Sequence, residues 1–167
     1  DTMSYSASAL SFMLENVAKP VIFTGSQLPI GDLRTDAKEN LITAIQIASL
    51  RNNNEPVVSE VCLYFEYKLY RGNRTTKINA EHFQAFTSPN YPELVESGVH
   101  LKLNSDLFLP LIKDKKLQVH KNLDTNVAII KLFPGISETV LAAILNIPNL
   151  KGVVLETYGA GNAPTED

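Results

Sequence analysis

The chain has 167 residues, 44% of them apolar, and a formal net charge of −3 at pH 7, so it can bury one substantial core. Charges of both signs are interspersed without a basic stripe, which argues against nucleic acid as the main ligand. Small molecules or protein partners therefore fit better as ligands. No apolar run approaches the roughly 20 residues that a membrane helix needs.

The first part of the chain predicts alternating helices and strands. Apolar residues at helical spacing predict a helix over 3–17, and the apolar run 21–23 predicts a short strand that ends in a polar turn at 24–26. A second helix is expected over 35–49, followed by a strand over 57–69. Helices that alternate with short apolar strands are typical of a mostly parallel sheet flanked by helices, whose strands bind ligands at their carboxyl ends.

The second part predicts a further α/β unit after an irregular region. The expected elements are a loop at 88–92, a strand at 99–103, a charged connector or hairpin at 104–124, a strand at 127–133, a helix at 136–144, a strand at 152–155 and a loop at 158–164. Because the chain starts at Asp1 without a methionine and stops before the helix expected after that loop, we expect material to be missing at both ends.

The stretch from Leu69 to Lys77 (Leu-Tyr-Arg-Gly-Asn-Arg-Thr-Thr-Lys) is the most informative part of the chain. It places hydroxyls, an amide and three cations on a turn that leaves an apolar strand. If desolvated or near other cations, the amine of Lys77 could take a proton from a neighbouring hydroxyl, provided that a carboxylate orients it. The alternative interpretation is a solvated basic turn.

Other polar positions have both functional and structural interpretations. Asp1 precedes the first helix, where capping alone explains a carboxylate. The turn at 24–27 either cradles a small polar ligand or only reverses the chain. Arg34 and Asp36 are expected to pair with each other or to cap the second helix.

Metal and nucleotide sites are not predicted. His82, His100 and His120 have no ligand spacing to one another or to Cys62, the single cysteine, which reads as a small buried hydrophobe and is compatible with a reducing compartment. The glycine-rich turn after Tyr158 lacks the complete dinucleotide spacing, because position 164 is proline.

Four segments, taken in order, resemble bacterial type I L-asparaginase. They are Asp1-Thr2-Met3 before a helix, Thr24-Gly25-Ser26-Gln27-Leu28-Pro29, the Leu69 to Lys77 stretch, and Tyr158-Gly159-Ala160-Gly161-Asn162. The resemblance implies an asparaginase-like α/β fold of two unequal domains. On this basis 1–103 is predicted as part of the N-terminal catalytic domain, 104–124 as the connector and 125–167 as the start of the smaller C-terminal domain.

The resemblance also implies the hydrolysis of L-asparagine to L-aspartate and ammonia by threonine hydroxyls, without a cofactor or metal. Asp1 and Lys77 match the aspartate and lysine that assist one threonine, and Asp1 also matches a substrate ligand. Ser26 is implied to hold the substrate amide through its backbone carbonyl. Thr76 and Asn162 are implied as contacts next to the lysine or in an effector region.

The resemblance has two departures. Neither of the expected nucleophilic threonines is in this sequence, so the chain alone is predicted to be inactive although its parent is an enzyme. Glu156 stands where some type I relatives have an arginine, which puts allostery driven by asparagine in doubt. The family further implies a cytoplasmic homodimer or homotetramer. The alternatives are a glutaminase-asparaginase, a subunit associated with transfer-RNA amidation, or a non-catalytic asparagine-binding module.

Overall fold

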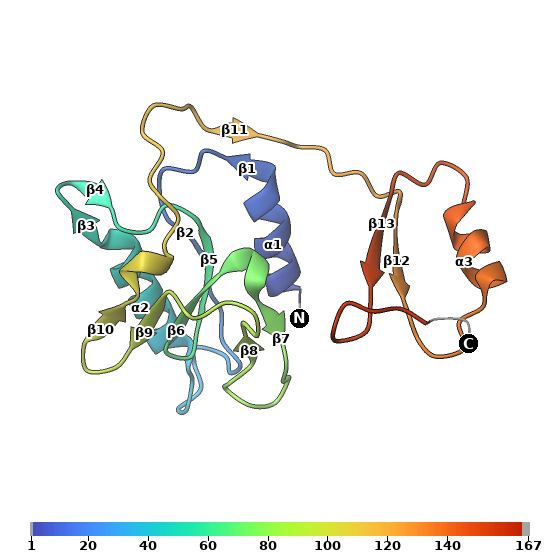
Figure 1. Cartoon of the computed structure of the whole chain (residues 1–167). Coiled ribbons are helices and arrows are strands. Elements are labelled where there is room, and N and C mark those ends of the chain that lie inside the picture. Colours follow the sequence, from blue (N-terminus) through green and yellow to red (C-terminus); the bar gives the residue numbers. More distant parts are fainter. Residues whose placement is uncertain (1, 165–167) are drawn as a thin grey trace. The chain divides into compact units, whose positions relative to one another are not determined.

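The computed structural model describes residues 2–164 (Figure 1), which form two compact units that meet between Lys121 and Asn122 in the sequence. Within the part of the chain that the structure describes, no helix has the length and apolar character needed to cross a membrane. The predicted division into an N-terminal domain (1–103), a connector (104–124) and a C-terminal domain (125–167) stays a prediction.

The first unit is a mixed sheet with helices. Its elements are α1 (Met3–Met13), β1 (Leu14–Glu15), β2 (Val21–Phe23), α2 (Ala37–Ser49), β3 (Arg51–Asn52), β4 (Glu55–Pro56), β5 (Val61–Phe65), β6 (Lys68–Arg71), the 3-10 helix η1 (Gly72–Arg74), β7 (Thr76–Lys77), β8 (Phe86–Thr87), β9 (Val95–Ser97), β10 (Leu101–Leu103), the 3-10 helix η2 (Ser105–Leu107) and β11 (Gln118–Val119). The main sheet has the order β10-β9-β6-β5-β2.

The α/β class is confirmed, but the expectation of a mostly parallel sheet is wrong for this unit. Only β2 and β5 pair in parallel, whereas the pairs β5–β6, β6–β9 and β9–β10 are antiparallel. The strand expected over 57–69 is a hairpin. Glu66 and Tyr67 form its two-residue turn with φ angles of +44° and +68°, the left-handed conformation that suits a tight hairpin. Neither residue is a glycine or asparagine, so the turn has no clear sequence signal.

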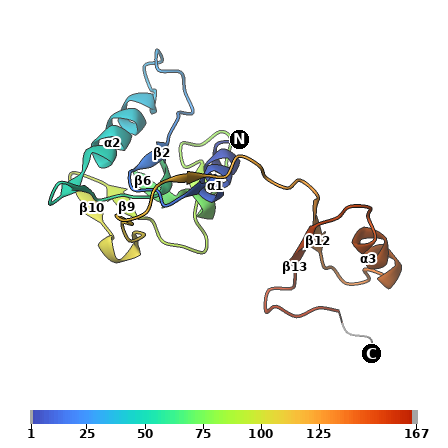
Figure 2. The ribbon, with the colours of Figure 1, turned by 90° about the horizontal axis from the view of Figure 1, so that it is seen from above.

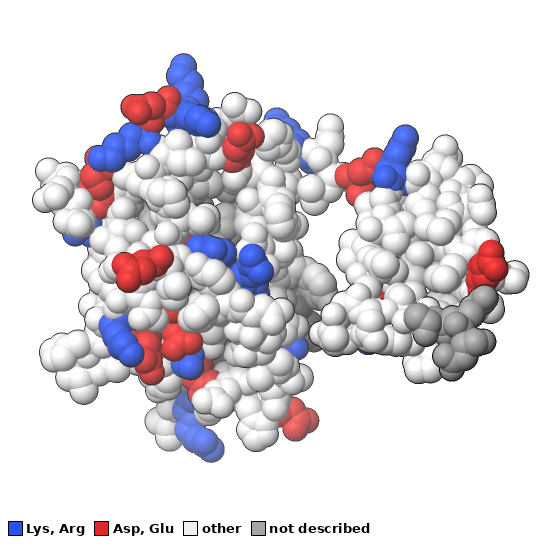
Figure 3. All heavy atoms as spheres, viewed as in Figure 1, with Lys and Arg blue, Asp and Glu red and all other residues white. Residues whose placement is uncertain are grey.

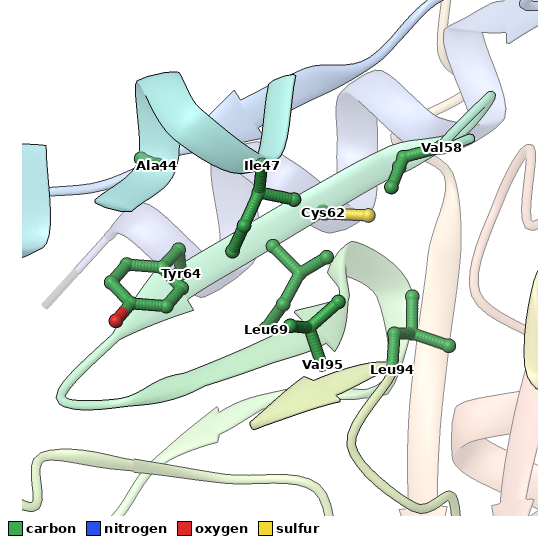
Figure 4. Packing of buried hydrophobic residues seen from close by; sticks show 8 residues of the cluster. All are labelled: Ala44, Ile47, Val58, Cys62, Tyr64, Leu69, Leu94 and Val95. Carbon is green, nitrogen blue, oxygen red and sulfur yellow. The ribbon is translucent and has the colours of Figure 1, made fainter. Parts of the chain in front are cut away.

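The core lies on both faces of β5, which is buried along its whole length. Successive residues of a strand point to opposite faces, so β5 contributes alternately to two clusters. Figure 4 shows the first cluster, which is formed by residues of α2, β5, β6 and β9 and of the segments just before β5 and β9. These residues are Ala44, Ile47, Val58, Cys62, Tyr64, Leu69, Leu94 and Val95. Burial raises the pKa of the Cys62 thiol.

The second cluster covers the other face and connects to α1. It contains Leu63, Phe65, Tyr70, Ala85 and Phe86, with Met3 and Phe23 packed against it. Figure 2 shows α2 on one side of strands β6, β9 and β10. The two clusters therefore hold the first turn of α1, the end of β2 and the β7–β8 pair in fixed positions within this unit.

The second unit contains the predicted strand, helix and strand. These are β12 (Val127–Lys131), α3 (Glu138–Leu145) and β13 (Gly152–Glu156), with β12 and β13 paired in parallel. The Ser137 hydroxyl accepts a hydrogen bond from the Val140 amide and caps α3. Strands in this unit leave apolar side chains exposed, such as Ile129 at 68%. On the face shown in Figure 3, charged residues of both signs are interspersed on the molecule.

Candidate active site

The first turn of α1 contacts the turn that follows β2. A Cβ at Gly25 would lie 3.7 Å from the sulfur of Met3, which also packs against the second core cluster. The Thr24 hydroxyl oxygen is buried in this turn and has no hydrogen-bond partner among the described residues. Ser26 follows on the exposed part of the turn. This region therefore presents hydroxyl and backbone groups beside the start of α1.

The same turn of α1 also lines a cleft with Thr76 and Lys77. The cleft has a volume of about 360 Å³ and is lined by Ser4, Tyr5, Thr76, Lys77, Ile78, Asn79 and Ala80. Thr76 is exposed and Lys77 is half-buried, with its Nζ 5.9 Å from the centroid of the Phe86 ring. Asp1, the predicted partner of Lys77, lies outside the described residues. The described geometry brings Thr76 and Lys77 to Ser4 and Tyr5, in the first turn of the helix that follows Asp1.

Gly72 permits α1 to approach the strand end so closely. A Cβ at this position would lie 2.9 Å from the backbone oxygen of Val61 and 3.3 Å from the Cβ of Ala7 in α1. Real Cβ atoms do not come within 3.0 Å of such an oxygen. Glycine is therefore the residue that lets η1 pack against α1 a few residues before Thr76 and Lys77.

The two arginines of the predicted motif have partners of their own. Arg71 Nε donates to Glu60 Oε2 at 2.6 Å, and Arg71 Nη2 donates to the carbonyl of Leu107 at 2.8 Å. Its guanidinium lies 4.3 Å from the centroid of the Tyr91 ring, and that of Arg74 lies 5.8 Å from the same ring. Burial disfavours the charged form of Arg71, but the hydrogen bond and charge of Glu60 outweigh it and raise the pKa. These cations hold the strand end in place and do not line the cleft.

Asp36 has a different role from the one expected. It neither pairs with Arg34 nor caps α2 with its side chain, so both predicted interactions are wrong. Its carboxylate instead accepts from the amide of Gln27 at 2.9 and 3.0 Å and from that of Leu28 at 3.1 Å. Sequence reasoning missed this because residues eight or nine apart in an irregular segment have no fixed separation.

Asn162 lies in the second unit, in a turn that starts at Tyr158. The Tyr158 amide donates to the Asn162 carbonyl at 3.0 Å, and Gly161 adopts a φ angle of +81°. The predicted role of Asn162 as an effector contact stays a prediction. Across residues 2–164, no group of three or more His, Cys, Asp or Glu side chains is arranged to hold a metal ion.

The fold and cleft define an α/β protein with polar turns gathered beside the start of its first helix. The family model "Asparaginase, N-terminal" matches residues 1–108, and "Glutaminase/Asparaginase C-terminal domain" matches residues 126–167. The chain belongs to the asparaginase family.

Three relatives illustrate the similarity. L-asparaginase 1 of Escherichia coli K12 is 46% identical over 164 residues, which are 98% of this chain and 46% of that protein. The mouse 60 kDa lysophospholipase is 45% identical over 166 residues, 99% of this chain but 28% of that protein. The crystal structure of L-asparaginase I from Vibrio cholerae matches with a TM-score of 0.86 at 41% identity, over 99% of this chain and 48% of that one. The chain thus spans about half, or less, of the length of these relatives.

Proposed function

We propose that the full-length protein containing this chain hydrolyses L-asparagine to L-aspartate and ammonia, by threonine-based chemistry without a cofactor. The observation that carries this proposal is the cleft that joins Thr76 and Lys77 to the first turn of α1, in a chain of the asparaginase family. A lysine beside a hydroxyl, oriented by a carboxylate, is an arrangement that activates a hydroxyl nucleophile.

Each site residue has a proposed role. Lys77 accepts or relays the proton of a threonine hydroxyl contributed by the rest of the protein. Asp1 holds that lysine or the ammonium group of the substrate. The Ser26 carbonyl accepts a hydrogen bond from the side-chain amide of the substrate, and Thr76 contacts the lysine or an effector. For proton transfer, donor and acceptor must come within hydrogen-bond reach, about 2.6–3.2 Å, once the substrate is bound.

The finer assignments are also proposals. We place the protein in the bacterial type I group, which the identity to L-asparaginase 1 of Escherichia coli supports. We further propose a cytoplasmic homodimer or homotetramer whose substrate is a small molecule. Asn162 is proposed to lie near a partner or effector contact.

The test is ammonia release by the full-length protein carrying Lys77→Met. We expect this substitution to abolish nearly all activity, because it removes the proton acceptor and keeps most of the side-chain volume. Lys102→Met is the matched control, since Lys102 is exposed on β10, away from the cleft, and pairs with Glu96 at 3.9 Å. Unchanged activity of the Lys77 variant would remove this lysine from the mechanism.

The substrate is tested in the same assay. Wild-type protein is given L-asparagine, L-glutamine or lysophosphatidylcholine, the last because of the activity in the name of the mouse relative. We expect turnover of L-asparagine. Release of fatty acid from the lipid, with no ammonia from either amide, would contradict the proposed function.

A further inference from the structure

One buried amide on α2 joins three separate segments of the first unit. The Asn40 side chain is 1% exposed, and its Nδ2 donates to the Gly25 carbonyl at 2.9 Å and to Asp36 Oδ2 at 3.1 Å. Its Oδ1 accepts from the backbone amide of Glu66, in the hairpin turn, at 3.0 Å. Both ends of the amide are therefore used, and its orientation is fixed by its partners.

The segment 25–28 is held at several points around Ser26. Asn40 binds the carbonyl before it, and Asp36 binds the amides of Gln27 and Leu28 after it. The Leu28 carbonyl accepts from the Thr35 hydroxyl at 3.1 Å. Ser26 itself makes no hydrogen bond with any described residue, so its backbone groups remain available to a ligand.

Within residues 25–28, Met3 contacts Gly25 and the Gln27 side chain donates to the His82 carbonyl at 2.7 Å, but apolar packing provides little anchoring where the loop continues. Beyond residue 28 its large apolar side chains point to solvent, with Ile30 59% exposed and Leu33 fully exposed. A loop with so few buried contacts opens easily unless hydrogen bonds hold it. Bonds to a carboxylate are the stronger kind, because the acceptor is charged.

We infer that Asp36 and Asn40 are positioning residues for catalysis, which hold residues 25–28 so that the Ser26 carbonyl faces the substrate. This inference rests on the proposed function, in which that carbonyl binds the substrate amide. Neither side chain contacts the substrate. Their effect on the reaction passes through the backbone that they fix.

The first test is Asp36→Asn in the full-length protein. The amide keeps one acceptor oxygen but loses the charge and the second acceptor, so the bonds to Gln27 and Leu28 weaken. We expect KM for L-asparagine to rise about tenfold, the value of one charge-assisted hydrogen bond, while kcat changes less than about twofold. Hydrogen exchange at the amides of residues 27 and 28 should become faster by a similar factor.

Asn40→Asp is the second variant, in case the first perturbs the loop too little. It keeps the acceptor for the Glu66 amide but turns an anionic oxygen toward the Gly25 carbonyl and the Asp36 carboxylate. We expect a larger increase in KM. Thr43→Val is the matched control, because Thr43 is buried on the same helix and donates to Glu39 Oε1 at 2.9 Å, away from residues 25–28.

The outcomes separate this inference from the proposed function. Both variants could lower the melting temperature as the control does, while KM stays unchanged and hydrogen exchange at the amides of residues 27 and 28 stays slow. In that case the network is only structural and the inference is wrong. If wild-type protein releases no ammonia, the proposed function fails. The exchange rates of residues 27 and 28 then still decide whether these two side chains hold the segment.

Discussion

Replacing Gly72 with alanine tests whether the close approach of α1 to η1 builds the candidate site. The added Cβ would lie 2.9 Å from the Val61 carbonyl oxygen, 3.2 Å from Val61 Cγ1 and 3.3 Å from Ala7 Cβ. Ordinary contacts begin at 3.4 Å, so η1 must move about 0.5 Å away from the Val61 oxygen of β5 and about 0.1 Å away from Ala7 of α1. The nearest atom is backbone and cannot rotate away, as a side chain would.

Overpacking of this kind lowers the free energy of unfolding by about 1–3 kcal/mol. We expect about 2 kcal/mol for Gly72→Ala, because Ala7 at the contact is fully buried and the nearest atom is backbone. Thermal unfolding followed by circular dichroism should show a midpoint lower by about 5 °C or more. The variant should also lose activity, because relief of the clash shifts η1, which precedes Thr76 and Lys77, relative to α1, which carries Ser4 and Tyr5 of the cleft.

Gly31→Ala is the control for this experiment. Nothing lies within 4 Å of a Cβ at position 31, so the same change in backbone freedom is introduced without a clash. If the Gly72 and Gly31 variants unfold at the same temperature, steric contact at Gly72 is not what requires glycine there.

Two further predictions concern buried charged and titratable groups in the first unit. Arg71→Met should lower the free energy of unfolding by about 3–5 kcal/mol, because it leaves the Glu60 carboxylate, 3% exposed, without its cation. Adding Glu60→Gln should restore much of this loss in urea denaturation, and equal stability of the single and double variants would contradict it. The pKa of Tyr70 is raised to about 12, first by burial and then by the charges of Glu93 and Glu66. The raised pKa stabilises the fold below pH 10, and this contribution disappears as the pH rises to 12. Between pH 10 and 12 the free energy of unfolding of Tyr70→Phe, measured by urea denaturation, should therefore fall less steeply with pH than that of the wild type.

The hairpin shows why part of the fold was not predictable. Alternating apolar residues run without interruption from Val61 to Leu69, and an isolated run of that kind predicts one long strand. The reversal at Glu66 and Tyr67 is instead stabilised by a residue far away in the sequence, since Asn40 Oδ1 on α2 accepts a hydrogen bond from the Glu66 amide. A hydrogen bond from a helix that is distant in the sequence cannot be predicted from the local sequence pattern of the hairpin.

The second unit was predictable for the opposite reason. Its strand, helix and strand are consecutive, and the cap at Ser137 lies next to the residues that it serves. Parallel strands need a crossover, so the order of elements already indicates the pairing. In this unit the local signals and the observed structure agree, because each interaction that defines an element lies close in the chain.

Within the stretch from Leu69 to Lys77, the proposed site residues lie at one end and residues that support the fold lie at the other. Arg71 pairs with Glu60, and Gly72 sets the spacing to α1, while only Thr76 and Lys77 line the cleft. A sequence cannot separate these roles, because a basic residue that binds a buried carboxylate and one proposed to serve a reaction carry the same charge. Their surroundings separate them. Arg71 pairs with the buried carboxylate of Glu60, whereas Lys77 lines a cleft beside the start of α1. The loss on mutation should therefore appear as instability for Arg71 and Gly72, and as lost turnover in a stable protein for Lys77.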